Sequence, residues 1–267
     1  MSFRELHRAG DPFVLMNVWD VGSARVAAAL GARAVGTSSA AHAFTLGRAD
    51  MGGVTRDEAL AHAEVMVAAT PLPVSADFEN GFARDPDGVA ESVRLAASTG
   101  LAGLSIEDTD LPETGPYEFD LAVERIEAAV GAARSAAGDL VVLARGDGVL
   151  NGSYDLDEGI RRLQAFERVG ADAVYLPGPP DVDALHRICE SVSAPVNALA
   201  AGPFTSLTRD DFAQLGVARI SLGSSLARVT HRATIDAARA ILDHGDFSPL
   251  AAGIPGSEVD RLLDGAS

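Results

Sequence analysis

The sequence predicts an α/β protein, a (β/α)8 TIM barrel formed by residues 1–267 as a single domain. Three observations predict it. Eight short apolar runs alternate with eight longer amphipathic stretches, the alternation fills most of the chain, and no linker or low-complexity segment interrupts it. An open doubly wound sheet is the structural alternative. No G-x-G-x-x-G follows the first apolar run, which weakens a dinucleotide-binding version of that sheet.

The short apolar runs predict the strands of the barrel, and the longer stretches between them predict its helices. In chain order the predicted strands are 13–18, 34–38, 74–77, 103–107, 140–145, 173–176, 195–198 and 219–222. The predicted helices are 22–30, 55–69, 85–99, 121–136, 156–169, 182–191, 208–215 and 224–243. From about residue 245 we expect an irregular extension that ends in a short helix at 256–263.

Local signals mark where several of these helices begin and end. Thr55 and Glu58 form a T-x-x-E capping box, in which each side chain binds a free amide of the first turn. Pro86 suits the first turn of the helix predicted at 85–99. Glycine just after a helix takes the left-handed conformation that ends it, and this signal follows four helices, at Gly31, Gly100, Gly170 and Gly216.

Composition excludes several classes of function. The net charge of −17 should be repelled by nucleic acids and anionic membranes, so we expect neither as a partner. All 21 basic residues are arginine, which excludes Schiff-base aldolases, pyridoxal-phosphate enzymes and Walker phosphate loops, since each needs a lysine. The single cysteine, Cys189, excludes an internal disulfide. Without a signal-peptide core or a long apolar run, a cytoplasmic location is expected.

Polar and charged residues follow the predicted strands, at the end of the barrel where active sites lie. Four or five carboxylates at one barrel mouth would repel each other and take up protons. A hard divalent cation would resolve this repulsion, and Mg2+ takes one or two carboxylates directly and others through water. The residues at the strand ends are Asn17, Trp19, Asp20, Ser38, Ser39, Asp77, Glu79, Glu107, Asp108, Arg145, Asp147 and Asn197.

Each of these residues also has a purely structural interpretation. A single Asp at a strand end is often a turn or a helix cap, Ser38 and Ser39 could fill a tight turn, and Trp19 could pack on the mouth. Arg145 could form a buried ion pair, whereas its functional interpretation is a guanidinium fork that holds a substrate carboxylate. His42 is expected on a surface loop. Carboxylates on two neighbouring strands favour the functional interpretation.

Seven motifs lie within residues 3–231: N-V-W-D-V-G-S-A-R at 17–25, G-T-S-S at 36–39, D-F-E-N-G-F at 77–82, S-I-E-D at 105–108, L-A-R-G-D at 143–147, G-A-D-A-V-Y at 170–175 and I-S-L-G at 220–223. Taken together, they resemble the isocitrate lyase/phosphoenolpyruvate mutase superfamily. The resemblance implies a (β/α)8 barrel whose last helix is exchanged between subunits of a dimer or a dimer of dimers. It also implies Mg2+, with Mn2+ as a substitute, and a bound 2-oxo acid.

The same resemblance implies roles for individual residues. The substrate-binding serine and the amide after it fall on Ser38 and Ser39, and the arginine of the superfamily falls on Arg145. The implied metal site consists of Asp77, Glu79 and Glu107, with Asp50 of G-R-A-D as an outer acid.

Segment 109–119 departs from the lyase branch of the superfamily. Isocitrate and methylisocitrate lyases carry K-K-C-G-H here, and its Cys is the acid/base, whereas this chain has no Cys, Lys or His in the segment. Tyr117, Glu113 or a metal-bound water remains as a candidate acid/base. The phosphonate branch often has a histidine near the end of the sixth strand, where this chain reads Tyr175-Leu-Pro177. The less specialised oxo-acid lyases and hydrolases fit better.

We therefore expect a Mg2+-dependent lyase that cleaves a C–C bond of a small 2-oxo or 2-hydroxy (di)carboxylic acid through a metal-stabilised enolate. The expected catalytic residues are Arg145, Glu107 and Tyr117. The expected substrate contacts are Ser38, Ser39, Arg145, Asn197 and Trp19. Two alternatives stay open: a phosphonopyruvate-type mutase or hydrolase that acts on a C–P bond, and a catalytically weak barrel that binds an oxo acid.

Overall fold

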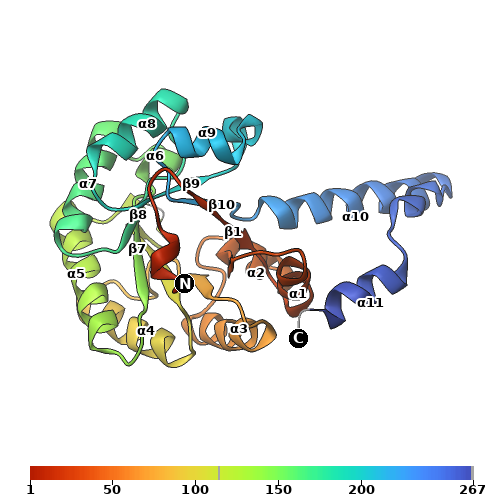
Figure 1. Cartoon of the computed structure of the whole chain (residues 1–267), viewed down its shortest axis with the longest axis horizontal. Helices are drawn as coiled ribbons and strands as arrows, with labels where there is room; N and C mark the ends of the chain where they lie inside the picture. Colours follow the sequence, from red (N-terminus) through yellow and green to blue (C-terminus); the bar gives the residue numbers. More distant parts are fainter. Residues whose placement is uncertain (114, 266–267) are drawn as a thin grey trace.

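Eight parallel strands close into a barrel in the computed structural model, which describes residues 1–113 and 115–265 (Figure 1). Around the barrel, the order of hydrogen-bonded neighbours is β1-β10-β9-β8-β7-β4-β3-β2. Each of the eight barrel strands lies within two residues of its predicted position, and the predicted TIM barrel is confirmed. The strands are β1 Phe13–Asn17, β2 Ala34–Gly36, β3 Val74–Asp77, β4 Gly103–Glu107, β7 Val141–Arg145, β8 Ala173–Tyr175, β9 Val196–Leu199 and β10 Arg219–Ser221.

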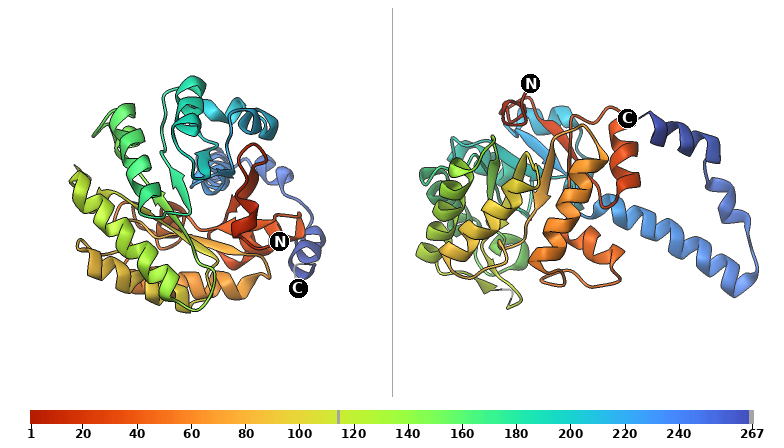
Figure 2. Two further views of the ribbon diagram at one scale, coloured as in Figure 1. Left: turned by 60° about the vertical axis from the view of Figure 1, so that its left-hand side comes forward. Right: turned by 90° about the horizontal axis from the view of Figure 1, so that it is seen from below.

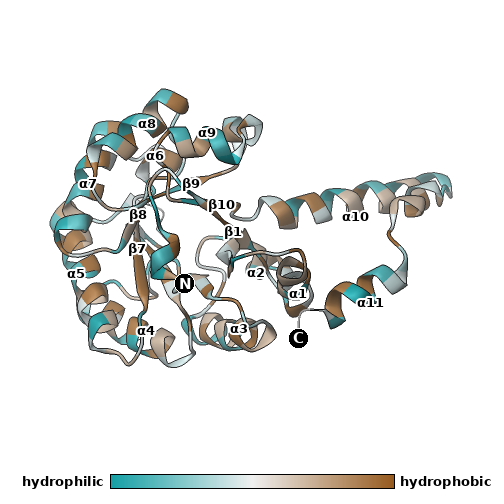
Figure 3. Cartoon of the chain, viewed as in Figure 1, coloured by the Kyte–Doolittle hydropathy of each residue, from teal (hydrophilic) through white to brown (hydrophobic). Residues whose placement is uncertain are grey.

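Amphipathic helices surround the barrel, and Figure 3 shows apolar and polar residues alternating along α4, α5 and α7. In α7, Ile160, Leu163 and Phe166 recur at helical spacing and are buried. Among the described residues, no helix is long and apolar enough to cross a lipid bilayer. The helices are α1 Val21–Ala29, α2 Ser39–Thr45, α3 Arg56–Ala69, α4 Pro86–Ser98, α5 Phe119–Ser135, α6 Gly148–Asn151, α7 Leu156–Arg168, α8 Val182–Ser191, α9 Arg209–Gln214, α10 Ser225–His244 and α11 Gly256–Asp264.

Side-chain caps fix where the helices start. The predicted capping box at α3 is confirmed, since Glu58 N donates to Thr55 Oγ1 at 3.3 Å and Thr55 N donates to Glu58 Oε2 at 2.9 Å. Ser38 caps α2, a helix that the sequence pattern does not predict. The expectation of a surface-loop His42 is therefore wrong: His42 lies in α2, is buried, and stacks on His62 with ring centroids 3.8 Å apart.

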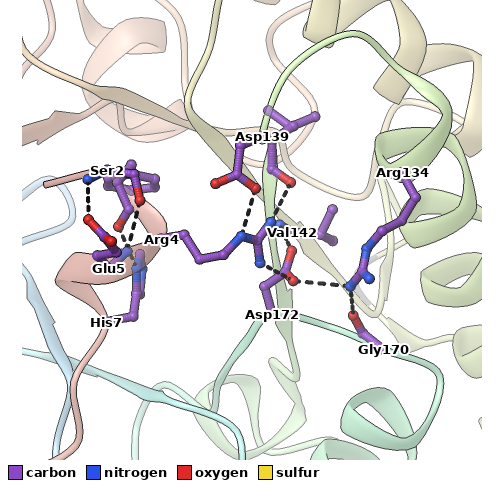
Figure 4. A network of polar contacts seen from close by, with 11 residues as sticks. Ser2, Arg4, Glu5, His7, Arg134, Asp139, Val142, Gly170 and Asp172 are labelled. Atoms are coloured by element: carbon purple, nitrogen blue, oxygen red, sulfur yellow. Dashed lines mark hydrogen bonds and ion pairs between the residues drawn. The ribbon is translucent and has the colours of Figure 1, made fainter.

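The N-terminal segment closes the amino end of the barrel. Its short 3-10 helix, η1 Arg4–Leu6, places Phe3 and Leu6 against Phe13 and Val141, at the start of β1 and β7. A Cβ on Gly103 would lie 2.7 Å from Phe3 Cε1, so glycine allows this approach. Arg4 anchors the segment by ion pairs with Asp139 (Nε–Oδ1, 2.7 Å) and Asp172 (Figure 4).

His7 makes the stability of this closed end sensitive to acid. Burial, and then the charge of Arg219, lower the pKa of His7 to about 3 from its ordinary 6.5. Below about pH 6.5 the imidazole of His7 binds a proton in the unfolded chain but not in the folded chain. The free energy of unfolding therefore falls as the pH drops, by up to about 1.4 kcal/mol per pH unit. Its ring meets Phe3 and Phe13 edge-on, so phenylalanine is a close replacement.

We expect His7→Phe to lose less free energy of unfolding than the wild type between pH 6.5 and pH 4. Urea unfolding at a series of pH values measures this difference, in which the carboxylates common to both proteins cancel. Above about pH 7.5 the two proteins should respond nearly alike, because His7 is then mostly neutral in the unfolded state as well as in the folded state. Parallel curves over the acidic range would contradict the assignment of His7 as a neutral, buried imidazole.

The last part of the chain leaves the barrel as an arm, residues 225–264, made of α10, η3 Ser248–Ala252 and α11. Figure 1 and Figure 2 show α10 projecting away from the barrel and α11 turning back towards α1. Large apolar side chains of the arm are exposed in the single chain, with Leu242 at 82% and Phe247 at 64%. Burying such a surface is favourable, so the arm suits contact with another subunit. Exchange of a helix between subunits remains a prediction.

We expect the protein to be a homo-oligomer held together by this arm. Leu242→Asp should weaken assembly, whereas a charge at an exposed position of a monomer would change stability by about 0.5 kcal/mol at most. Sedimentation velocity at micromolar concentration measures the assembly state, with Asp243→Asn on the same turn as a control that should leave it unchanged. A wild-type protein that sediments only as a monomer would contradict the prediction.

Candidate active site

Charged side chains from three adjacent strands meet at the carboxyl end of the barrel. Asp77 ends β3, Glu107 ends β4, and Arg145 ends β7. Glu107 and Arg145 are direct partners in the register of β4 with β7, so their side chains project on the same side of the sheet. Arg145 Nη1 lies 3.4 Å from Glu107 Oε2 and 3.6 Å from Asp77 Oδ1. The predicted arginine and two of the predicted acids therefore form one cluster.

Asp147 fixes the guanidinium of Arg145 in place. Arg145 Nη2 donates to Asp147 Oδ2 at 2.6 Å, and Nε donates to Asp147 Oδ1. This pair of parallel hydrogen bonds sets the plane of the guanidinium. Burial lowers the pKa of Arg145, but Asp147, Glu107 and Asp77 raise it by more, so its pKa lies well above the ordinary value. Arg145 is thus a permanent cation among carboxylates.

Asp108 positions the loop that carries Asp147. Its Oδ1 accepts from Asp147 N at 2.8 Å, while its Oδ2 accepts from Tyr154 OH at 2.9 Å and from Arg162 Nη1 at 3.0 Å. Arg162 also donates to the Tyr117 carbonyl oxygen at 2.9 Å. Asp108 is almost fully buried and its carboxylate is paired, so it supports the cluster and is not free to bind a ligand.

The D-F-E-N-G-F segment after β3 forms a tight turn that aims Glu79 at the mouth. Glu79 has a φ of 44°, Gly81 of 76° and Phe82 of 55°, all in the left-handed region. Glu107 N donates to the Glu79 carbonyl oxygen at 2.9 Å, which ties the turn to β4. Such costly backbone conformations persist where the surroundings enforce them, and they are common at functional sites.

Ser38 and Ser39, predicted as substrate contacts, lie beside Asp77 at the start of α2. Ser39 donates to Asp77 Oδ2 twice, from its backbone N at 3.0 Å and from its Oγ at 2.9 Å. Ser38 Oγ accepts from Ala41 N at 3.4 Å as the cap of α2. In this arrangement Ser39 orients the carboxylate of Asp77, and the Ser38 hydroxyl keeps its own proton for another acceptor.

Burial and mutual repulsion raise the pKa values of the acids around this cluster. Burial, followed by the charges of Asp77 and Asp50, raises the pKa of Glu79 to about 7. Burial and the nearby Asp147 raise the pKa of Glu107 well above its usual range, and burial raises that of Asp50. One arginine does not compensate so many carboxylates, and a further cation would stabilise their charged forms.

The residues fit a divalent cation that is bound through few direct ligands. Asp77 Oδ1 is buried and has no hydrogen-bond partner among the described residues, whereas its Oδ2 is held by Ser39. Within residues 1–113 and 115–265, no three His, Cys, Asp or Glu side chains stand close enough to form a protein-only metal cage. Mg2+ keeps several waters and needs only one or two carboxylates directly. Direct binding at Asp77, with Glu79, Glu107 and Asp50 around it, is compatible with both observations.

The remaining predicted site residues have other contacts in the structure. Asn197 is buried inside the barrel, where its Nδ2 donates to Ser221 Oγ at 2.9 Å. Trp19, after β1, is half-buried, and its carbonyl oxygen meets His62 Nε2 at 3.0 Å. Tyr117 is buried 3.8 Å from the Arg125 guanidinium, and its hydroxyl accepts from Asn80 Nδ2 at 3.0 Å. None of these contacts tests the catalytic or substrate-binding roles, which stay predictions.

Two of the cavities at this end of the barrel differ in chemistry. The larger, of about 310 Å³, lies at the rim over β8 and β9, and apolar residues such as Leu176, Leu199 and Phe204 line it without any titratable group. The smaller, of about 50 Å³, opens inside the mouth and is lined by Asp77, Arg145 and other polar residues. Because acid–base chemistry and anion binding need charged groups, the smaller mouth cavity is the candidate active site despite its size.

Residues 3–242 match the sequence model of the family described as phosphoenolpyruvate phosphomutase. The chain belongs to this family. It is 30% identical to the oxaloacetate decarboxylase of Paraburkholderia xenovorans, over 99% of this chain and 88% of that protein. The predicted membership of the phosphoenolpyruvate mutase/isocitrate lyase superfamily is thereby confirmed. This superfamily comprises oxo-acid lyases and hydrolases, and its members typically use Mg2+.

Solved structures of this superfamily share the fold. The crystal structure of a candidate lyase/mutase from Burkholderia cenocepacia superposes with a TM-score of 0.92 at 42% identity, over 97% of this chain and 93% of that one. The structure of 2,3-dimethylmalate lyase gives a TM-score of 0.83 at 26% identity, over 95% and 90% of the two chains. The phosphoenolpyruvate mutase barrel is thus well established for this chain.

Two features of the mouth carry little signal in the sequence. Asp147 is predicted as a strand-end residue, but its bond to Arg145 is not, because Asp147 precedes the short helix α6, which the pattern does not predict. Arg219 starts β10 and points into the barrel, where it lines the mouth cavity. The spacing of Arg219 and Ser221, two apart in a short strand, was the one available signal, since such residues share a face.

Proposed function

We propose that this chain is a divalent-metal-dependent lyase that cleaves a C–C bond in a small 2-oxo or 2-hydroxy (di)carboxylic acid. The observation that carries the proposal is the cluster at the strand ends, where a fixed cation, Arg145, lies among carboxylates. One of their oxygens, Asp77 Oδ1, has no hydrogen-bond partner among the described residues. Arg145 and the proposed metal site lie side by side. Together they would suit a substrate that is negatively charged and rich in oxygen atoms. Relatives named oxaloacetate decarboxylase and 2,3-dimethylmalate lyase support this class of substrate.

The residues of the mouth would act on such a substrate as follows. Arg145 Nη1 has only the longer contacts, of 3.4 and 3.6 Å, so it is the group best placed to bind a substrate carboxylate. The Ser38 hydroxyl can donate to the same anion. Mg2+ or Mn2+, held by Asp77 with Glu79, Glu107 and Asp50, would supply Lewis-acid stabilisation of the negative charge that develops on the 2-oxo oxygen.

Three side chains are candidates for the proton donor after bond cleavage: Glu107, Tyr117 and Glu113. Glu107 is buried at the mouth, and burial and the nearby Asp147 raise the pKa of its carboxyl group. Tyr117 and Glu79 line a neighbouring cavity of about 340 Å³, between the turn after β3 and segment 109–117. Glu113 is exposed on the same segment. Glu107 therefore fits the role of proton carrier at the mouth, and Tyr117 would act from the adjoining space.

A second candidate function keeps the same site but breaks a C–P bond. The match to the phosphoenolpyruvate phosphomutase family model favours it, and phosphonopyruvate offers the same 2-oxo acid end to Arg145. A third candidate is an oxo-acid-binding barrel with little turnover, which the absence of Cys, Lys and His from segment 109–119 favours. The three candidate functions differ in the products that they form. In each of them Arg145 binds the same part of the ligand, the 2-oxo acid end.

One experiment separates these functions. The purified protein with Mg2+ is incubated with oxaloacetate, 2-alkylmalates and phosphonopyruvate, and the products are followed by proton and phosphorus magnetic resonance. The proposal expects C–C cleavage products that disappear in excess chelator and with Arg145→Lys, which keeps the charge but loses the fork. Products from phosphonopyruvate alone would favour the C–P function. Binding of 2-oxo acids without any product would favour the binding barrel.

A further inference from the structure

Arg219 is a buried cation without a carboxylate partner. Its side chain is 5% exposed, and its Nε donates to Asn197 Oδ1 at 2.8 Å. Its Nη1 is buried and has no hydrogen-bond partner in the part of the chain that the structure describes. Burying a charge is costly unless the charge is paired and hydrogen-bonded, so an unpaired guanidinium inside a barrel needs an explanation.

The other buried arginines of the protein have satisfied surroundings. Arg145 lies among three carboxylates, and Arg162 pairs with Asp108 and Glu158. Arg125 donates to backbone carbonyl oxygens, among them those of Arg84 and Ala83. Within residues 1–113 and 115–265, no ion pair is found for Arg219. Arg219 is therefore the buried arginine that has donors left over.

Arg219 lines the mouth cavity from below. In the strand register, Glu107 pairs with Arg145, Arg145 with Tyr175, Tyr175 with Asn197, and Asn197 with Arg219. Direct partners project on the same side, so this row of side chains winds from the mouth into the barrel. Both arginines line the same cavity, together with Tyr175 and Ser221. A ligand held by Arg145 at the mouth would extend towards Arg219.

The charge of Arg219 favours an anionic ligand in the lower part of this cavity. A water molecule could accept from Nη1 but would leave the charge of Arg219 uncompensated. Burial lowers the pKa of Arg219 to about 10, so the guanidinium stays charged at neutral pH. The cavity volume of about 50 Å³ has room for a group of a few atoms, since one water needs about 10–15 Å³. A carboxylate meets both the charge and the size requirement.

We propose that Arg219 binds the second carboxylate of a dicarboxylic substrate inside the barrel, while Arg145 holds the 2-oxo acid end at the mouth. The inference rests on the proposed function, because it takes a 2-oxo or 2-hydroxy acid as the substrate. It narrows that class to dicarboxylates. Arg219 is a specificity-determining residue in this assignment, and its guanidinium becomes paired only when the substrate is bound.

Matched ligands test the proposal. Oxaloacetate and 2-oxobutyrate have the same number of carbons and differ in a terminal carboxylate or methyl group. Their Kd values with the wild-type protein and Mg2+ are measured by calorimetry in the cold, or their KM values where the ligand is consumed. We expect the wild type to prefer oxaloacetate. A charge-assisted pair of hydrogen bonds corresponds to a preference of about 10- to 100-fold.

Two variants assign this preference to Arg219. Arg219→Gln keeps a donor for Asn197 but removes the charge, and it should lose the preference while binding 2-oxobutyrate within about twofold of the wild type. Arg219→Lys keeps the charge and should retain part of the preference. The exposed Glu124→Gln is a control that should match the wild type.

The outcomes distinguish this inference from the proposed function. Equal affinity of the wild type for both ligands would overturn the role of Arg219 and leave the proposed function intact, and this result needs no variant to fold. Equal loss of both ligands in Arg219→Gln would also overturn the role, since it indicates a general effect on the barrel. Failure of the wild type to bind either acid would overturn the proposed function itself.

Discussion

Asp77→Ala is expected to abolish divalent-metal binding and with it the lyase activity. Asp77 Oδ1 is buried without a hydrogen-bond partner among the described residues, and Ser39 holds the other oxygen of Asp77 in a fixed direction. A metal that stabilises developing charge contributes several kcal/mol, and about 1.4 kcal/mol corresponds to a tenfold change in rate. We therefore expect turnover to fall by about 10³-fold or more.

Mn2+ titration followed by electron paramagnetic resonance measures the metal directly, and the assay of C–C cleavage measures its consequence. Asp77→Asn keeps the volume and an acceptor for Ser39, so it separates the loss of charge from the loss of packing. The exposed Glu124→Gln removes a carboxylate elsewhere and should change neither quantity. Full turnover of the wild type in excess chelator would contradict the metal dependence from which this prediction follows.

The protein should be a poor isocitrate or methylisocitrate lyase. Those reactions leave a carbanion-like product that must receive a proton, and in the resembling lyases a loop cysteine gives it. Here the corresponding segment forms the short hairpin β5 Thr109–Asp110 with β6 Gly115–Pro116, and its residue Thr114 lies outside the described residues. Tyr117 N donates to the Asp108 carbonyl oxygen at 2.8 Å, so the end of the hairpin is held against β4.

Loss of a positioned acid typically lowers a rate by about 10²–10⁴-fold, or roughly 3–5 kcal/mol of barrier. Isocitrate cleavage should be reduced by this factor, whereas binding of 2-oxo dicarboxylates should persist, because Arg145 and the acids of the mouth remain. Calorimetry with oxo acids and a coupled glyoxylate assay test the two parts separately. Isocitrate turnover near ~10 s⁻¹, a usual enzyme rate, would show that another group such as Tyr117 or Glu113 donates the proton.

The strands and most helices could be predicted because each carries its own periodic pattern. Buried parallel strands are short apolar runs, and helix caps such as Thr55 are local in sequence. α2 could not be predicted in this way, since its residues 39–45 are mostly small or apolar and its start depends on Ser38, which reads equally well as a turn. The burial of His42 follows from the missed helix and from its stacking on His62.

The candidate site was predictable where charged residues follow strands, and less so inside the barrel. Asp77, Glu107 and Arg145 come together because the ends of neighbouring strands must meet. Which side Arg219 faces depends on the register of a three-residue strand, which has no pattern of its own. The direction of α10 could not be predicted from the sequence either. An amphipathic helix has the same sequence pattern whether it covers its own barrel or a second subunit.

Phe3 and Leu6 close the amino end of the barrel, and this affects where a purification tag can be placed. The entrance for ligands and ions is therefore the carboxyl end of the strands, where the charged cluster lies. A purification tag fused ahead of Met1, which is itself exposed, would emerge on the opposite side and keep clear of that entrance. A tag at the carboxyl terminus would instead be carried by the arm and would interfere with any assembly that the arm supports.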